Sequence, residues 1–208
     1  MRKIIIFDID RTIVDSLGPE TNSMSEAVKI VTGKELTKEE LNRFMSSTTE
    51  KFLNSFNYDK EVIDKICHEW RKVYVKYKTK CFPGMKDVIK WLDSNGYTIG
   101  IITSRTLDEF HELDEVLSDI AYTFKAVVTC NLVEKPKPDR SSIDYLCNVL
   151  KCSCDDVIYV GDSKIDMEFA SNSGVAFIPA CFENQELSNE ENACFDTNEL
   201  IRIIKELE

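Results

Sequence analysis

The sequence predicts an α/β fold in which helices cover both faces of a mainly parallel β-sheet. An apolar run at residues 4–7 opens the chain as a buried strand, and after residue 82 short apolar strands alternate with helical segments. A long helical stretch with little strand character lies between them. Because the first strand needs a sheet to join and the sheet-forming segments come after residue 96, this stretch is predicted to be an insertion.

The insertion is expected to contain about four helices, which is enough for a small bundle. Residues 24–31 carry apolar side chains at helical spacing, and Gly33 can end that helix. From residue 59 onward a longer helix presents one broad apolar face. We therefore expect a helical domain at residues 18–80 and a core domain formed by residues 1–17 and 81–208.

The core domain follows a regular order of helix and strand, with crossovers that favour parallel pairing. Strands are expected at residues 4–7, 97–102, 126–129, 157–160 and 175–178. Helices are expected at residues 85–94, 107–117, 141–150, 165–172 and 198–207.

The composition indicates a folded cytoplasmic protein. With 208 residues, of which 43% are hydrophobic, the chain can bury a full core. No run approaches the roughly 18 apolar residues that span a bilayer, and a strand pattern stands where a signal peptide would begin. The eight cysteines lie mostly in apolar segments, so they are interpreted as reduced, packed thiols.

The net charge of −11 restricts the possible partners. Nucleic-acid binding depends on clustered Lys and Arg, so a nucleic acid is not expected as a partner, and neither is a membrane. An anionic substrate approaching several carboxylates would need a divalent cation between them.

Polar side chains follow the predicted strands at four places. The crevice beyond the carboxyl ends of parallel strands is where ligands bind, so one site can collect all four groups. They are Asp8 with Asp10, Thr103 with Ser104, Lys135 in a Lys-Pro-Lys-Pro segment, and Asp162 with Asp166.

The first pair, Asp8 and Asp10, has two interpretations when taken alone. Aspartate is common in turns and at helix N-termini, so the pair can be structural. Because residues two apart lie on the same face of an extended strand, the two carboxylates can also share one metal ion where the strand ends. The other polar groups along the chain favour the catalytic interpretation.

These motifs resemble, in their order, those of the haloacid dehalogenase superfamily, specifically its phosphatases of the phosphoglycolate phosphatase type. The resemblance covers essentially the whole chain and includes the insertion, which looks like the family's small helical (C1-type) cap. It implies a Rossmann-like three-layer core. The motifs that carry it are Asp8-x-Asp10-x-Thr12 followed by Val14-Asp15-Ser16, Thr103 at a strand end, Lys135 before Pro136, and Gly161-Asp162-x-x-x-Asp166.

The resemblance also implies a role for each residue. Asp8 would attack phosphorus to form an aspartyl-phosphate, and Asp10 would protonate the leaving alcohol and then activate water. A Mg²⁺ ion would be held by Asp8, the main-chain carbonyl of Asp10, and Asp162. The phosphoryl oxygens would be held by Thr103, Lys135 and Ser104, with Thr12 and Asp166 in supporting positions.

Three basic residues near the motifs need an interpretation. Arg11 stands where the family usually has glycine. Its side chain either enters the cleft and binds a second anionic group of the substrate or turns outward into solvent. The outward orientation is favoured. Lys137 is interpreted as a loop lysine, because Lys135 fits the motif better. Arg105 is interpreted as a surface cation.

The expected function is that of a Mg²⁺-dependent phosphatase acting on a small phosphate monoester, such as phosphoglycolate or a sugar phosphate. A phosphomutase of the β-phosphoglucomutase type remains an alternative, and so does a catalytically weak binding or regulatory protein, to which Arg11 is the one pointer. The partner is expected to be a small phosphorylated metabolite, and both a monomer and a homodimer are open. Substrate choice would depend on the insertion, where Ser46 to Lys51 form a polar break between helices.

Overall fold

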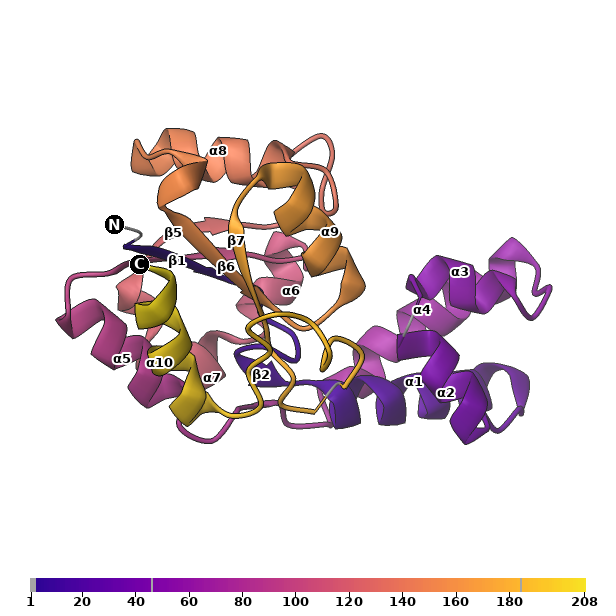
Figure 1. Ribbon diagram of the computed structural model, residues 1–208. Coiled ribbons are helices and arrows are strands. Elements are labelled where there is room, and N and C mark those ends of the chain that lie inside the picture. The colour runs from indigo at the N-terminus through magenta and orange to yellow at the C-terminus, as the bar shows by residue number, and fades with distance from the viewer. Residues whose placement is uncertain (1–2, 46, 184) are drawn as a thin grey trace. The chain divides into compact units, whose positions relative to one another are not determined.

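The computed structural model describes residues 3–45, 47–183 and 185–208, so Ser46 lies outside the described residues. The chain forms two compact units. The first, here called the α/β unit, comprises Met1–Asp15 and Lys80–Glu208, and the second, the helical unit, comprises Ser16–Thr79. Figure 1 shows the elements of both units.

A parallel sheet of five strands forms the centre of the α/β unit, in the order β5-β4-β1-β6-β7. The strand β1 lies in the middle and is hydrogen-bonded along both edges, to β4 and to β6. This confirms the predicted α/β class with a mainly parallel sheet. The strands are β1 (Ile4–Phe7), β4 (Thr98–Ile102), β5 (Phe124–Val128), β6 (Val157–Gly161) and β7 (Ala176–Pro179).

Two hydrophobic clusters cover the two faces of the sheet, because successive side chains of a strand point to opposite faces. On β1, Ile5 and Phe7 belong to one cluster and Ile6 to the other. Figure 1 shows the helices of each layer on its own side of the sheet. The first cluster packs α5 (Met85–Ser94), α7 (Asp114–Leu117) and α10 (Thr197–Leu207), and the second packs α8 (Ser141–Leu150) and α9 (Lys164–Ser173).

The structure departs from the predicted elements at residues 107–117, where one helix was expected. Two short helices, α6 (Leu107–His111) and α7, replace it. A capping box between Thr106 and Glu109 starts α6. The break falls at Leu113, whose side chain is buried in the first cluster, so burial of this leucine competes with continuation of the helix.

Short elements complete the α/β unit. The pair β2 (Val14–Asp15) and β3 (Lys80–Cys81) is antiparallel, and it lies where the chain leaves and re-enters this unit. A strand of two residues is too short to show a periodic pattern of apolar side chains, so the sequence did not predict this pair of strands. Two 3₁₀ helices, η1 (Ala121–Thr123) and η2 (Cys154–Asp156), lead directly into β5 and β6.

The helical unit has its own hydrophobic core. Its central side chains come from all four helices, and Trp70 donates a hydrogen bond from Nε1 to Ser23 Oγ at 2.8 Å. The Trp70 ring also meets the ring of Phe44 edge to face, with centroids 5.7 Å apart. The helices are α1 (Leu17–Thr32), α2 (Lys38–Met45), α3 (Thr49–Asn54) and α4 (Lys60–Tyr74).

Among the described residues, no helix combines the length and the apolar character that crossing a membrane requires.

The central strand makes a direct stability prediction. Ile6 is wholly buried, so Ile6→Ala should lower the free energy of unfolding by about 2–5 kcal/mol through lost burial and the cavity left behind. Ile165 on α9 is 42% exposed, and Ile165→Ala should stay within about 0.5 kcal/mol of the parent. Urea titration followed by circular dichroism measures both changes, and equal losses would contradict the assigned core.

Candidate active site

Three of the expected site residues follow three neighbouring strands. Asp8 comes directly after β1, Thr103 after β4 and Asp162 after β6. The amide of Asp8 donates to the Val160 carbonyl at 2.8 Å, and that of Thr103 donates to the Val128 carbonyl at 3.0 Å. Since parallel strands end at the same edge of the sheet, the topology brings these side chains to one place.

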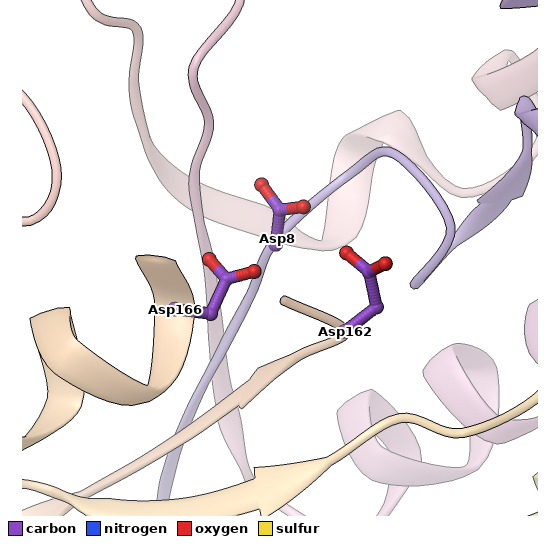
Figure 2. A group of neighbouring side chains, drawn as sticks. All are labelled: Asp8, Asp162 and Asp166. Carbon is purple, nitrogen blue, oxygen red and sulfur yellow. The ribbon is translucent and has the colours of Figure 1, made fainter. Parts of the chain in front are cut away.

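Three carboxylates form a buried acidic cluster at this edge. Asp8 is 6% exposed, Asp162 1% and Asp166 1%. One oxygen atom from each carboxylate lies within 4.8 Å of the other two, and Figure 2 shows the three side chains gathered beyond the strand ends. Like charges at this separation repel strongly in a low-dielectric setting, so the cluster requires cations beside it.

Lys137 supplies one of these cations. Its Nζ donates to Asp8 Oδ1 at 2.8 Å, to Asp166 Oδ1 at 2.7 Å and to the Tyr159 hydroxyl at 3.1 Å. The side chain is 4% exposed, so the three contacts satisfy an ammonium group that is almost fully removed from water.

This corrects the interpretation of the two lysines in the sequence, because the structure places Lys135 in the exposed part of the loop and Lys137 in the site. Lys135 lies near Asp139, whose pKa it helps to lower after the hydrogen bonds from Ser141. The loop turns at Pro136, whose carbonyl accepts from the Asp139 amide at 3.0 Å. It is also tied to α9 through Asn172, which donates to the Pro138 carbonyl at 2.9 Å. This fold of the loop directs the second lysine inward.

Asp166 is fixed by its own helix and by β6. Ser163 caps α9, and its hydroxyl and amide both donate to Asp166 Oδ2, at 2.5 and 3.1 Å. The Tyr159 hydroxyl donates to Asp166 Oδ1 at 2.8 Å. A Cβ on Gly161 would lie 2.6 Å from the Asp166 side chain, so glycine is required for this close approach.

Burial and mutual repulsion shape the pKa values of the cluster. Burial raises the pKa of Asp8 to about 7; attraction to Lys137 opposes the rise, and repulsion from Asp166, Asp10 and Asp162 adds to it. Burial also disfavours ionised Asp166, but attraction to Lys137 and the hydrogen bonds it accepts outweigh burial and lower its pKa. For Lys137, the two carboxylates outweigh burial and raise its pKa, so the ammonium persists.

Arg11 is not turned outward as expected. Its Nε lies 3.2 Å from Asp162 Oδ2, and its side chain is 17% exposed. Its backbone is left-handed, with φ of 58°, a conformation that costs a non-glycine residue on the order of 1 kcal/mol. The turn is held by the Arg11 amide, which donates to the Val14 carbonyl at 2.7 Å, and by amides of the following residues that donate to the Ile9 carbonyl.

Asp10 forms a second polar network with Arg105, which the sequence interpretation left at the surface. Nε and Nη2 of Arg105 donate to Asp10 Oδ2 and Oδ1, both at 2.7 Å. A third bond from Nη1 to the Glu109 carbonyl, at 3.1 Å, fixes the guanidinium, and the Arg105 amide donates to Thr103 Oγ1 at 3.1 Å. This fork is the strong bidentate geometry of an arginine and a carboxylate.

The remaining expected residues occupy different positions. Thr12 is wholly buried in the turn after β1, and its hydroxyl has no hydrogen-bond partner among the residues that the structure describes. Ser104 is exposed at the end of β4. The structure therefore brings the expected Asp8, Thr103, Asp162 and Asp166 together with Lys137, Arg11 and Tyr159, and it places the expected Asp10 with Arg105.

The donor set of the acidic cluster fits a divalent cation. Within the described residues, it is the one group of three or more acidic, His or Cys side chains close enough to share a metal ion. Magnesium prefers hard oxygen ligands of this kind. The expected ligand set consisted of Asp8, Asp162 and the main-chain carbonyl of Asp10. In the structure, the third carboxylate of the cluster is that of Asp166. The side-chain carboxylate of Asp10 is bound to Arg105 instead.

Sequence reasoning missed Tyr159 because it looks like an ordinary aromatic residue of a buried strand. A signal for Lys137 was present, since prolines flank it on both sides and stiffen its backbone. Arg105 carried no such signal, because its contact with Asp10 joins residues 95 positions apart.

The two lysines of the loop provide a matched stability test. Lys137→Met leaves Asp8 and Asp166 buried without their shared cation, so at pH 8 the free energy of unfolding should fall by about 3–5 kcal/mol. Lys135→Met changes an exposed side chain and should stay within about 0.5 kcal/mol. Denaturant titration measures both, and a larger loss for the Lys135 variant would contradict the assigned positions.

Sequence comparison agrees with the geometry. The model of the haloacid dehalogenase-like hydrolases matches residues 5–180. PpaX of Clostridium perfringens, whose name assigns it provisionally to the pyrophosphatases, is 25% identical over 177 residues, which are 84% of this chain and 81% of PpaX. Phosphoglycolate phosphatase of Pseudomonas savastanoi pv. phaseolicola is 23% identical over 188 residues, covering 85% of this chain and 68% of that protein.

Comparison of structures gives the same fold. A Lactobacillus plantarum protein, described provisionally as a phosphoglycolate phosphatase, superposes with a TM-score of 0.83 at 18% identity, covering 98% of this chain and 99% of that one. The family match spans most of the sequence and includes the acidic cluster and Lys137. The chain therefore belongs to the haloacid dehalogenase-like hydrolases.

Proposed function

We propose that this protein is a Mg²⁺-dependent phosphatase that hydrolyses a small phosphate monoester through an aspartyl-phosphate. The observation that carries the proposal is the position of Asp8, a buried carboxylate directly after the central strand, beside Lys137 and two further carboxylates. The names of the relatives, phosphoglycolate phosphatase among them, support this class of substrate.

Asp8 would act as the nucleophile on phosphorus. It must be ionised to attack, and the Lys137 ammonium at 2.8 Å favours the ionised form against the burial that raises its pKa. The residues that would hold Mg²⁺ are Asp8 and Asp162, with the Asp10 carbonyl and Asp166 beside them. When bound, the cation would supply positive charge between the phosphoryl oxygens and the carboxylates.

Asp10 would donate a proton to the leaving oxygen and later accept one from the attacking water. The fork from Arg105 holds this carboxylate in one orientation, while its side chain remains 20% exposed and therefore reachable by a substrate. Thr103 and Ser104 at the end of β4, together with Lys137, would bind the phosphoryl oxygens, in place of the expected Lys135. Thr12 would support the turn, and Asp166 would orient Lys137.

The substrate is proposed to be a small phosphorylated metabolite, such as phosphoglycolate or a sugar phosphate. A phosphomutase that returns the phosphoryl group to a second hydroxyl would use the same Asp8 and Asp10. A panel of phosphoglycolate, sugar phosphates and pyrophosphate separates these outcomes, because hydrolysis releases inorganic phosphate and a mutase yields an isomer of its substrate. Pyrophosphate belongs in the panel because of the relative PpaX.

The role of Asp8 is tested with an aryl phosphate and purified protein. We expect turnover with Mg²⁺ that disappears on chelation by EDTA and returns when Mg²⁺ is restored. Asp8→Asn removes the nucleophile at nearly constant volume and should lower kcat by at least about 10³-fold, measured as phosphate release. Lys135→Ala serves as the control and should keep parental kcat. Equal activity of Asp8→Asn and the parent would sink the phosphatase proposal.

The Arg105 fork predicts a dependence on the leaving group. Arg105→Gln should release Asp10, and a poor leaving group needs its proton most, so kcat/KM for an alkyl phosphate should fall at least about tenfold more than for dinitrophenyl phosphate. Arg140→Gln breaks an exposed ion pair with Asp144 and should change neither value. An equal loss on both esters would show that Arg105 only supports the fold.

A further inference from the structure

The acidic cluster has two cationic partners of different kinds. Lys137 lies between Asp8 and Asp166 and also contacts Tyr159, so it is held from three sides. Arg11 instead lies beside Asp162, at 3.2 Å from Nε to Oδ2, on the other side of the cluster. Since Asp162 is 1% exposed, its carboxylate needs a neighbouring positive charge, and Arg11 provides one.

The backbone of Arg11 adopts a conformation that costs free energy for a residue other than glycine. Arg11 has the left-handed φ of 58° that glycine adopts freely, and the turn bonds on both sides of it hold that conformation. The guanidinium is thus directed at Asp162 by a rigid turn. This arrangement places a fixed positive charge next to a carboxylate that the proposed function assigns to Mg²⁺.

We propose that Arg11 is a built-in counter-cation of Asp162 that competes with divalent metal, so that metal binding requires the guanidinium to move away from this carboxylate. The inference rests on the proposed function in one respect, the assignment of the acidic cluster as the metal site. In this role, Arg11 sets how tightly the protein binds Mg²⁺.

A second acidic partner lies within electrostatic reach of the Arg11 guanidinium. Asp15 and Glu183 interact with each other: burial and the neighbouring Asp15 raise the pKa of Glu183, while Arg11 lowers it. Both residues belong to the α/β unit, as Arg11 does. The pair therefore offers Arg11 negative charge after it leaves Asp162.

The test is a direct measurement of Mg²⁺ affinity without substrate. Isothermal titration of metal-stripped protein should give Arg11→Gly a dissociation constant for Mg²⁺ at least about tenfold lower than that of the parent, because a positive charge a few ångströms from the site is removed. The glycine also suits the left-handed turn, so the variant should fold. Lys135→Ala removes a positive charge from the exposed loop and should stay within about twofold.

The outcomes decide the proposal. Tighter binding by Arg11→Gly, or binding seen in that variant but not in the parent, supports the competition. Unchanged or weaker binding overturns it, and so does the absence of Mg²⁺ binding in both proteins. Phosphate release from an aryl phosphate, assayed separately on the parent, tells this failure apart from a failure of the proposed function: an active phosphatase with unchanged affinity in Arg11→Gly refutes only the role of Arg11.

Discussion

The contact between the Lys137 ammonium and the buried carboxylates is the interaction on which the rest of the site depends. It joins Asp8 after the central strand, Asp166 on α9 and Tyr159 on β6 to the loop before α8. Without a cation, two carboxylates this deeply buried would repel each other or take up protons. The ammonium allows negative charge to remain at the strand ends, which is the condition for a carboxylate nucleophile and for a divalent cation.

The hydrophobic frame explains why these charges keep their positions. The central strand is covered on both faces and paired on both edges, so the residues that follow it leave from a fixed point. The polar groups are then divided into two networks, one around Lys137 and one in which Arg105 holds Asp10. The proposed nucleophile, Asp8, and the proposed acid, Asp10, are therefore held by different cations. The helical unit has a hydrophobic core of its own.

Much of the fold and part of the site were predictable from sequence. Alternating strands and helices predicted the parallel sheet, since burial on both faces produces continuous apolar runs. Polar residues directly after those runs located Asp8, Thr103 and Asp162 at one edge. The break in the helix after His111 was not predictable in this way, because burial of Leu113 outweighs local helical periodicity.

The sequence by itself determined the order of the elements, the edge of the sheet where the site lies and the residue types it contains, because these follow from periodicity and from the ends of strands. Only the tertiary structure decided which cations serve the carboxylates. The Lys-Pro-Lys-Pro segment offers two lysines, Lys135 and Lys137, and the fold of the loop selects the second. Arg11 reaches Asp162 because of the shape of the turn after β1. Arg105 reaches Asp10 through a contact between segments that are distant in the sequence. Such contacts depend on three-dimensional proximity, which local sequence pattern does not encode.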